Sequence, residues 1–460
     1  MVGIASCGAY LPVLRLALPP SGERTVGNYD EDSITMAVEA AIDCLKGTDR
    51  NQVDAVYFAS TTPPYAEKQC AALIACVLDL QNNPNTVDFI GSTRSATMAL
   101  KAAMDAVKAG SAKKVLVVAA DRRVGPAQSD IDKTSGDGAA AVLITDQAPV
   151  AIENSYCLTD EFTFNWRKPE DEFVRGWEER FIMTEGYQPL MKKAVAGLLK
   201  SAGMKTADIT KAALYAPNAR QHQALVKDLK LDPKAQVAGG ALLSSVGNTG
   251  TALALMMLVA ALEGAKPGDT IVMANFGDGA DAYLLKVKAK PDSKGKGIKG
   301  FLPSKLMISN YMDYLPLKDL LKAEEKGEPA GSLTALWRER RAVYGCNGVR
   351  CKTCGTLQYP IQRVCCQCQT KDNFELVNLS EKKGKLVTFT KEMGPSPEYP
   401  RVWSVSELEG GCRFFCVLAD ADASKMDEKS MGMPVEMTFR RLSGGSGFHN
   451  YIWKCRPARG

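Results

Sequence analysis

SGDGAAAVLI, residues 135–144, and FGDGADAYLL, residues 276–285, are two copies of one pattern. In each copy a Gly-Asp-Gly turn leads into a run of small and apolar residues, which is typical of a buried strand that follows a tight turn. A similar succession of strand, helix and strand precedes each copy. The repeat indicates one large α/β domain built from two similar lobes, and it predicts a functional site where the lobes meet.

The segments before each copy alternate β-branched runs with helical periodicity, as expected of sheets covered by helices. In the first half, strands are predicted at residues 2–6, 55–59, 86–90, 115–120 and 139–144, and helices at 32–46, 68–80 and 94–109. In the second half, strands are predicted at residues 212–216, 270–275 and 282–287, with helices at 188–202, at 219–230 and after the Gly-Asn-Thr-Gly turn of residues 247–250.

The composition of the 460 residues excludes several classes of protein. With 45% hydrophobic and 24% charged residues, the chain is neither collagen-like, nor a coiled coil, nor wholly disordered. No apolar run approaches the roughly 18 residues that cross a bilayer, and the first residues lack a basic segment followed by a cleavage site. We therefore expect a cytoplasmic protein of two or three domains.

Charge and cysteine content both change toward the C-terminus. Residues 331–460 hold 20 basic and 13 acidic residues, a net charge of +7, whereas residues 1–330 hold 37 and 39, a net charge of −2. Nine of the 14 cysteines follow residue 345, and such clustering in a cytosolic chain indicates a metal site rather than disulfides. The natural partners of the basic part carry phosphates or carboxylates.

Two Cys-x-x-Cys pairs form the strongest local signal. Cys351 and Cys354 precede Cys365 and Cys368 by ten residues, which places four thiolates on two tight turns, as a tetrahedral structural Zn²⁺ requires. Cys366 is an alternative to Cys365 as a ligand. Because the protein supplies all four ligands, we expect this zinc to support folding and not catalysis.

We predict four segments along the chain: the α/β domain at residues 1–290, a linker at 291–331 that partly docks on it, a helix plus zinc ribbon at 332–375, and a small β-barrel at 376–460. The barrel strands are expected at residues 385–392, 411–418, 434–441 and 451–455. A zinc ribbon beside a basic barrel is compatible with nucleic-acid binding, and its charge suits the phosphates of coenzyme A equally well.

Several stretches together resemble one known family. They are VGIASCGAYLP (residues 2–12), YDEDSITMAVEAA (29–41), AVYFASTTPPYA (55–66), YAPNAR (215–220), SVGNTG (245–250) and FGDGADAY (276–283). In this order they resemble hydroxymethylglutaryl-CoA synthases of the archaeal type, in the thiolase superfamily, with β-ketoacyl synthase III as a more distant relative. The resemblance covers residues 1–290 and implies a duplicated five-layer αβαβα domain.

The C-terminal third has a resemblance of its own. Residues 332–458 look like the zinc-ribbon and OB-fold domain that accompanies thiolase-like enzymes, usually as a separate subunit. Here it is fused to the enzyme-like domain. The fusion favours coenzyme A over nucleic acid as the partner of the basic part.

The residues that match the family's catalytic positions depart from the family. A cysteine at a helix N-terminus takes the acyl group in the family, a histidine is the acid–base group, and a glutamate assists. Those positions match Thr93, Tyr215 and Thr61 here, and an alternative register places the histidine position at Asn218. Since threonine is a poor nucleophile without a base beside it, the site is expected to bind a thioester without forming a cysteine acyl-enzyme.

Other family positions are kept. Asn248 matches the asparagine that holds a thioester carbonyl, and an amide aimed at a developing oxyanion contributes roughly 3 kcal/mol in comparable sites. Tyr65 remains in its place as a second candidate for proton transfer. The expected contacts with substrate or coenzyme A are Arg220, Thr61 and Ser245.

The remaining histidines and cysteines are expected to be structural. His222 is predicted on the polar surface of a helix, and His449 in a loop of the barrel. Cys70 and Cys76 lie in the helix-like run QCAALIACVLDL, where apolar neighbours favour packing.

The main hypothesis is aldol or retro-aldol chemistry on a β-hydroxyacyl-CoA, with Tyr215 or Tyr65 moving the proton and Asn248 holding the thioester oxygen. One alternative is Claisen acyl transfer of the hydroxymethylglutaryl-CoA synthase or thiolase kind, either with the family positions shifted by a few residues from those matched above or with Thr93 as an unusual nucleophile. Another is a non-catalytic scaffold that binds acyl-CoA for a partner thiolase. The resemblance also implies a homodimer, with a separate thiolase or dehydrogenase as a possible partner; no membrane partner is expected.

Overall fold

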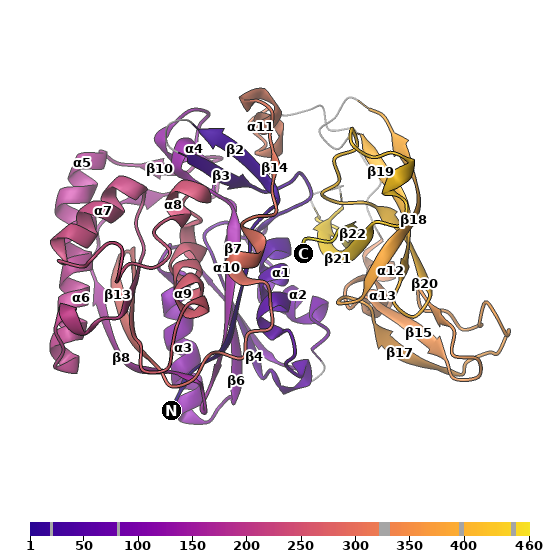
Figure 1. The fold of residues 1–460 in the computed structure, drawn as a ribbon, viewed down its shortest axis with the longest axis horizontal. Coiled ribbons are helices and arrows are strands. Elements are labelled where there is room, and N and C mark those ends of the chain that lie inside the picture. The colour runs from indigo at the N-terminus through magenta and orange to yellow at the C-terminus, as the bar shows by residue number, and fades with distance from the viewer. Residues whose placement is uncertain (19–21, 81–82, 322–331, 395–399, 443–447) are drawn as a thin grey trace. The chain divides into compact units, whose positions relative to one another are not determined.

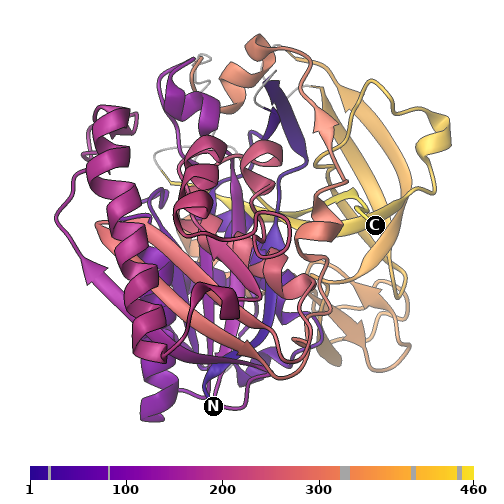
Figure 2. The ribbon, with the colours of Figure 1, turned by 60° about the vertical axis from the view of Figure 1, so that its left-hand side comes forward.

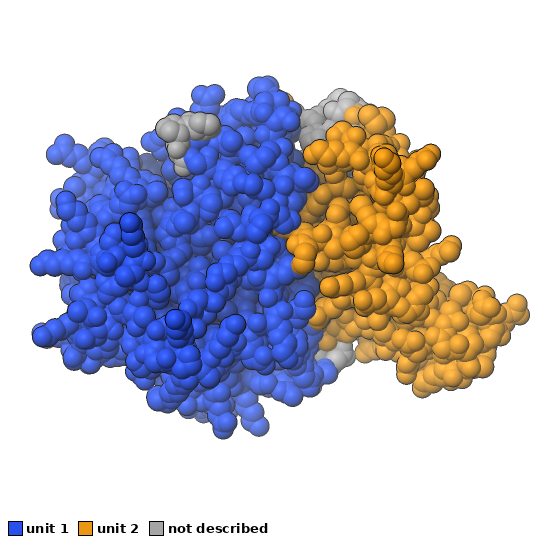
Figure 3. Space-filling model, viewed as in Figure 1, with its two compact units in different colours: residues 1–27, 32–75, 80–320 blue, residues 28–31, 76–79, 321–460 orange. Residues whose placement is uncertain are grey.

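The structure is a computed structural model that describes residues 1–18, 22–80, 83–321, 332–394, 400–442 and 448–460. The chain forms two compact units, coloured separately in Figure 3. Unit 1 consists of Met1–Gly27, Asp32–Ala75 and Leu80–Leu320, and unit 2 of Asn28–Glu31, Cys76–Asp79 and Leu321–Gly460. None of the described helices is long and apolar enough to cross a membrane.

Unit 1 is built on a nine-stranded sheet with two halves. The first half has the order β1-β7-β6-β4-β5, where the strands are β1 (Gly3–Tyr10), β4 (Ala55–Ser60), β5 (Asn85–Ile90), β6 (Lys114–Asp121) and β7 (Gly138–Thr145). The second half has the order β8-β13-β12-β11, where the strands are β8 (Val150–Thr159), β11 (Lys211–Leu214), β12 (Thr270–Gly277) and β13 (Gly279–Val287).

The pairing repeats from one half to the other. In the first half, β7 pairs antiparallel with both β1 and β6, and β6 pairs parallel with β4. In the second half, β13 likewise pairs antiparallel with both β8 and β12, and β12 pairs parallel with β11. Where β5 completes the first half, the second half has a single parallel bridge between Ala212 and Val237. A short pairing between β1 and β8 joins the halves. The duplication predicted from the Gly-Asp-Gly turns is confirmed.

Helices cover both outer faces and fill the space between the halves, as Figure 1 shows. On the outside of the first half lie α1 (Ser33–Leu45) and α2 (Cys70–Val77), and on the outside of the second lie α6 (Gln188–Ala202) and α7 (Ala219–Asp228). Between the halves lie α3 (Ser95–Ala109) and α9 (Leu253–Glu263), and α9 contacts β7 as well as β11 and β12. Figure 2 shows the same layers from another side. The expected five-layer arrangement is confirmed.

Local sequence explains where these helices begin and end. Asp32 accepts a hydrogen bond from the Thr35 backbone, and the Thr35 hydroxyl accepts one from the Asp32 backbone, which forms a capping box before α1. Gly110 ends α3 in the left-handed conformation, with φ of 75°. Nearly every residue of α9 is buried, as its place between two half-sheets requires.

Unit 1 also contains elements that the hydrophobic pattern did not predict. Strand β8 is buried only over its first three residues and carries Glu, Asn and Ser in its interior, so it lacks a long apolar run. A hairpin of β2 (Leu14–Leu18) and β3 (Gly22–Val26) precedes α1. Smaller elements are α4 (Asp130–Thr134), the pair β9 (Asn165–Trp166) and β10 (Arg175–Gly176), α5 (Glu179–Phe181) and α8 (Leu242–Ser245).

The stretch that follows β13 contains regular structure up to residue 317. It holds α10 (Gly297–Phe301), β14 (Leu306–Met307), which pairs with β2, and α11 (Tyr311–Leu317). The buried ammonium of Lys318 lies 2.7 Å from the Asp137 carboxylate, so this segment is fixed to unit 1. Residues 322–331, the end of the linker expected at 291–331, lie outside the described residues.

Unit 2 contains a three-stranded ribbon and a five-stranded barrel-like sheet. The ribbon consists of β15 (Asn347–Cys351), which pairs with β16 (Leu357–Gln358) and β17 (Phe374–Asn378). The larger sheet has the order β20-β19-β18-β21-β22, where the strands are β18 (Lys383–Glu392), β19 (Arg401–Leu408), β20 (Cys412–Val417), β21 (Pro434–Arg441) and β22 (Tyr451–Pro457).

The sheet of unit 2 nearly closes on itself. The backbone N–H of Cys455 in β22 donates to Cys416 Sγ in β20 at 3.1 Å, so the two edge strands approach each other. The expected barrel is confirmed as a barrel-like sheet, although β19 had not been predicted. The helix expected at the start of residues 332–375 is divided into α12 (Leu333–Arg338) and α13 (Arg340–Val343).

Candidate active site and cysteine cluster

Thr93 and Asn248 occupy equivalent places in the two halves of unit 1. Thr93 lies just before α3, and Asn248 lies just before the short helix η4 (Gly250–Ala252) that leads into α9. Thr93 is buried, and its hydroxyl donates to the Phe276 carbonyl at 2.9 Å. The hydroxyl proton is therefore held by a backbone oxygen and not by a base that would activate it.

A small cavity of about 100 Å³ opens beside Thr93. Thr61 and Arg123 line it together with Thr93, and the other lining residues are Gly91, Ser92, Phe164, Asn165, Trp166, Arg167, Val174, Gly277 and Asp278. Among the described residues that line it there is no cysteine, histidine or glutamate. The cavity offers hydroxyl, amide, guanidinium and carboxylate groups, and the described lining residues supply neither a thiol nor an imidazole.

Tyr215 and Asn248 are in direct contact. The Asn248 amide donates to the Tyr215 hydroxyl at 3.2 Å and to the Pro217 carbonyl at 3.2 Å, and its oxygen accepts from the Gly250 backbone at 2.9 Å. Tyr215 is completely buried, and burial raises its pKa although the nearby Arg123 guanidinium and the Asn248 hydrogen bond act in the opposite direction. The phenol is thus held neutral, as a proton donor must be.

Asp121 holds the surrounding loops in place, and sequence reasoning missed it. It is fully buried at the end of β6, and its carboxylate accepts hydrogen bonds of 2.7–3.2 Å from Ser60, Thr61, Thr62 and Thr251. These donors come from the end of β4 and from η4, next to Asn248. A signal was available in KVLVVAAD, where a charged residue directly ends a buried strand.

Arg123 is the second residue that sequence reasoning missed. It lines the cavity, and its side chain passes the Asn248–Gly250 turn, because a Cβ added at Gly250 would lie 2.7 Å from Arg123 Cδ. Gly250 also has a φ of 58°, which favours glycine. Arg123 therefore connects the cavity beside Thr93 with the Tyr215–Asn248 pair.

The structure gives the other predicted site residues structural roles or exposed positions. Asn218 caps α7 by accepting from the Gln221 backbone at 2.9 Å, and the Ser245 hydroxyl donates to the Ala241 carbonyl. Arg220 is exposed at the start of α7. Tyr65 is half-buried, its ring 5.6 Å from the Lys68 ammonium, and it is not among the residues that line the cavity.

His222 is buried, so the prediction of a surface histidine was wrong. It lies in α7 on the same face as Leu225 and Val226, at the spacing that turns side chains inward. Its side chain is 5% exposed, its Nε2 has no hydrogen-bond partner among the described residues, and burial lowers its pKa to about 4. Cys70 is buried as expected, and burial raises its pKa to about 12.

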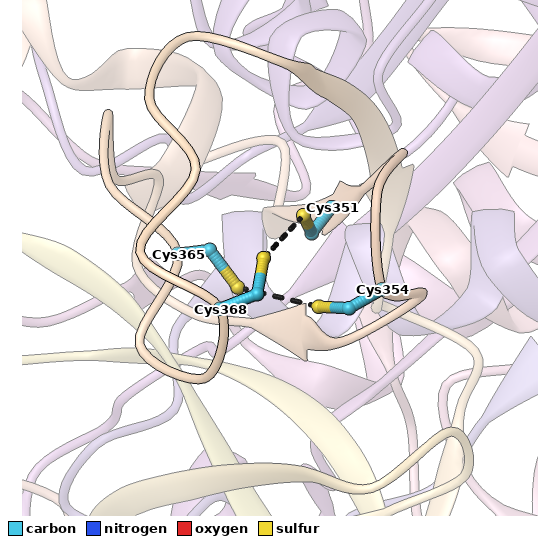
Figure 4. Close-up of side chains that lie close together, drawn as sticks. All are labelled: Cys351, Cys354, Cys365 and Cys368. Atoms are coloured by element: carbon cyan, nitrogen blue, oxygen red, sulfur yellow. Dashed lines mark hydrogen bonds between the residues drawn. The ribbon is translucent and has the colours of Figure 1, made fainter.

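The four predicted cysteines come together in unit 2, as Figure 4 shows. The ligand atoms of Cys351, Cys354, Cys365 and Cys368 all lie within 4.8 Å of one another. Cys351 Sγ is 3.6 Å from Cys368 Sγ, and Cys354 Sγ is 3.5 Å from Cys365 Sγ. Four sulfurs at about 2.3 Å from one tetrahedral ion lie about 3.8 Å apart, so the donor set fits Zn²⁺.

Both Cys-x-x-Cys turns have the same backbone geometry. Gly355 N–H donates to Cys351 O at 2.8 Å, and Gln369 N–H donates to Cys365 O at 3.0 Å. Gly355 and Gln369 both have a positive φ, of 78° and 61°. Each turn ends in a threonine near its second sulfur, and the hydrogen bond with Thr356 lowers the pKa of Cys354 to about 6. Cys366 lies outside the group of four.

The duplicated five-layer domain has the fold of the thiolase superfamily. Family models for 3-oxoacyl-[acyl-carrier-protein (ACP)] synthase III match residues 87–160, and those for its C-terminal part match residues 199–286. The hydroxymethylglutaryl-CoA synthase of Thermococcus sibiricus is 30% identical over 334 residues, which cover 68% of this chain and 94% of that protein. The chain belongs to the hydroxymethylglutaryl-CoA synthase family.

Other relatives and solved structures agree. The hydroxymethylglutaryl-CoA synthase of Pyrococcus furiosus is 30% identical over 302 residues, covering 62% of this chain and 86% of that protein. A solved HMG-CoA synthase complexed with CoA matches with a TM-score of 0.63 and 18% identity, covering 72% and 95% of the two chains. The 3-oxoacyl-[acyl-carrier-protein] synthase III of Aquifex aeolicus VF5 matches with a TM-score of 0.55 and 22% identity, covering 62% and 100%. The last two matches support the fold.

Proposed function

We propose that this protein forms a carbon–carbon bond on a CoA thioester, as synthases of its family do, but without an acyl-enzyme. The observation that carries the proposal is the buried pair formed by Tyr215, which follows β11, and Asn248, which precedes η4 and α9. At the acyl-acceptor position stands Thr93, whose hydroxyl donates its proton to a backbone carbonyl. The family comparisons favour condensation over the cleavage direction of the aldol hypothesis.

The proposed chemistry assigns a role to each member of the pair. An enolate of one thioester adds to the carbonyl carbon of a second substrate, and the oxygen of that carbonyl becomes an alkoxide. Asn248 and nearby backbone N–H groups hold the thioester oxygen, where developing charge is stabilised by fixed dipoles. Tyr215, kept neutral by burial, donates its proton to the alkoxide and takes up the proton that leaves the α-carbon of the first thioester, so that it ends the addition neutral; Tyr65 is the second candidate for this proton transfer.

Claisen acyl transfer through Thr93 is the second candidate, because the relatives are synthases. It requires a base for the Thr93 hydroxyl, and the described cavity wall contains no histidine or glutamate. A scaffold that only binds acyl-CoA is the third. The homodimer and the partner thiolase or dehydrogenase remain proposals that follow from the family.

Tyr215→Phe tests the proposal. We expect it to lower kcat by at least about hundredfold with little change in KM, because it removes the proton and keeps the ring. The assay detects β-hydroxyacyl-CoA products by mass spectrometry over a panel of acyl-CoA and carbonyl substrates. Tyr57→Phe, on β4 of the same unit, is the matched control and should keep full activity.

Three results would contradict the proposal. Intact-protein mass spectrometry that finds an acyl adduct on Thr93 would support acyl transfer. Turnover that survives Tyr215→Phe would remove the proton donor from the mechanism. Binding of coenzyme A without turnover of any pair in the panel would support the scaffold.

We also propose that Cys351, Cys354, Cys365 and Cys368 bind a structural Zn²⁺. Their sulfur spacing and the matched turns support it, and four protein ligands leave no open position for a substrate. In this proposal the basic unit receives the phosphates of coenzyme A; nucleic-acid binding with a steep loss of affinity in salt would be the contrary result.

A further inference from the structure

We propose that Arg123 binds a carboxylate at the far end of the acyl chain, so that the preferred substrates are acyl-CoA thioesters whose acyl group carries a second carboxylate. This inference rests on the proposed function for the thioester end of the substrate. Arg123 follows β6 directly, is 5% exposed, and lines the cavity that Thr61 and Thr93 also line. The family resemblance places the acyl group beside Thr93.

The Arg123 guanidinium lacks the counter-ion that a buried arginine usually has. The Asn165 side-chain amide can be oriented so that its nitrogen donates to the Phe164 carbonyl and its oxygen accepts a hydrogen bond from Arg123 Nη2 at 3.1 Å. Arg123 Nε has no partner, and no carboxylate in the described part of the chain forms an ion pair with Arg123. A buried charge is unfavourable unless it is paired, so this cavity wall is suited to an anion.

Other arginines near the site do have carboxylate partners. Arg94 donates to both oxygens of Asp281, at 2.7 and 2.9 Å, and Arg122 lies 3.0 Å from Asp319. Of Arg94, Arg122 and Arg123, only Arg123 has no carboxylate partner among the described residues. A planar guanidinium with free N–H groups matches the two oxygens of a carboxylate.

Nearby acidic groups form no ion pair with Arg123 in the described part of the chain. Asp121 lies two residues earlier, and its oxygens accept hydrogen bonds from serine, threonine and backbone donors. Asp278 lines the cavity as an exposed residue, and the exposed Arg167 lines it as well. Arg167 donates only to the backbone carbonyls of Thr61 and Asp171, so two arginines and one aspartate line the cavity.

The place and size of the cavity favour the end of an acyl chain. It measures about 100 Å³, and Thr93, at the acyl-acceptor position, lines it together with Arg123. A small carboxylate suits such a cavity better than the adenosine phosphates of coenzyme A. We therefore assign the anion to the acyl group and not to the coenzyme.

Titration calorimetry on the full chain tests the inference with succinyl-CoA, butyryl-CoA and coenzyme A alone. Succinyl and butyryl groups have the same chain length and differ in the terminal carboxylate. We expect succinyl-CoA to bind at least about tenfold more tightly than butyryl-CoA, as a charge-assisted hydrogen bond predicts. Arg123→Met should abolish this preference and leave the affinities for butyryl-CoA and coenzyme A unchanged.

Two further variants keep the test informative. Arg123→Lys retains the charge without the planar fork and should keep part of the preference, and it replaces Arg123→Met if that variant does not fold. Lys200→Met removes a positive charge from the exposed face of α6 and should keep the full preference.

Contrary results separate this inference from the proposed function. Equal binding of succinyl-CoA and butyryl-CoA by the unaltered chain would overturn the carboxylate site and leave the proposed function intact. An equal loss of affinity for all three ligands in Arg123→Met would assign Arg123 to the coenzyme and overturn the inference. Failure to bind any of the three would overturn both.

Discussion

At the scale of single residues, the site is decided by which polar groups are satisfied and which are not. Asp121 is saturated with donors, Thr93 has given its proton to a carbonyl, and Tyr215 accepts from Asn248. Arg123 and His222 are two of the buried residues that have a nitrogen without a hydrogen-bond partner among the described residues; Arg24 and Arg122 are others. Unsatisfied buried groups cost stability, which is why Arg123 and His222 call for a functional or a pH-dependent explanation.

His222 should make the stability of unit 1 depend on pH. Burial lowers its pKa to about 4, below the value near 6.5 of an unfolded histidine. The unfolded chain therefore binds the proton first as pH falls, and stability decreases between about pH 6.5 and 4 and is fully present above that range. We expect His222→Gln to reduce this loss by about 1–3 kcal/mol, measured by urea unfolding at pH 7 and pH 4.5.

The chain's second histidine supplies the control. His449→Gln leaves His222 in place and should unfold with the pH dependence of the unaltered chain. Identical pH slopes for His222→Gln and the unaltered chain would show that the buried ring does not cause the effect.

At the scale of elements, the ribbon is fixed by two turns that present their cysteines in the same way. Cys365 belongs to the group of four and its exposed neighbour Cys366 does not. We expect Cys365→Ser to lose the metal and Cys366→Ser to keep about one zinc per chain, measured by elemental analysis of the purified protein. Because the ion contributes folding free energy, Cys365→Ser should also make residues 332–460 sensitive to trypsin.

A strong chelator provides an independent check on the ribbon. It should reproduce the protease sensitivity of Cys365→Ser in the unaltered chain. Resistance of residues 332–460 after complete removal of metal would mean that the ribbon folds without it. If Cys365→Ser retains zinc and Cys366→Ser loses it, Cys366 and not Cys365 is the fourth ligand.

At the scale of the whole molecule, unit 2 includes a short segment from early in the chain. Arg440 is fully buried, with Asp30 at 3.2 Å, Glu31 at 3.0 Å and Asp420 at 2.5 Å, and Lys454 lies 2.8 Å from Asp30. Burial alone would raise the pKa of Asp30, but Lys454 and Arg440 outweigh it and lower the pKa. This stabilisation is present above about pH 4 and is lost as the pH falls toward the lowered pKa.

Arg440→Met should destabilise unit 2 by about 3–5 kcal/mol, because it leaves buried carboxylates without their main partner. Arg413→Met is the control in the same sheet, since Arg413 is exposed and 3.9 Å from Glu407; it should change stability by less than about 0.5 kcal/mol. Denaturant unfolding followed by tryptophan fluorescence measures both. Equal stability of the two variants would mean that the buried cluster contributes no more than a surface pair.

The sequence alone determined the duplicated fold, the family and the cysteine cluster. Each depends on patterns that are local or repeated: apolar periodicity, the Gly-Asp-Gly turns, and pairs of cysteines on tight turns. It also located Thr93, Tyr215 and Asn248, because ordered motifs carry them. Sequence could not show β8 or β19, whose mixed side chains acquire strand structure from the neighbours with which they pair.

Only the tertiary structure decided which distant residues meet. It joined Tyr215 to Asn248, surrounded Asp121 with donors from two loops, buried His222, and left Arg123 unpaired beside a cavity. The reason is physical. Burial, pairing and the pKa of a group depend on atoms that come close only after folding, and the position of a residue in the chain does not determine those atoms.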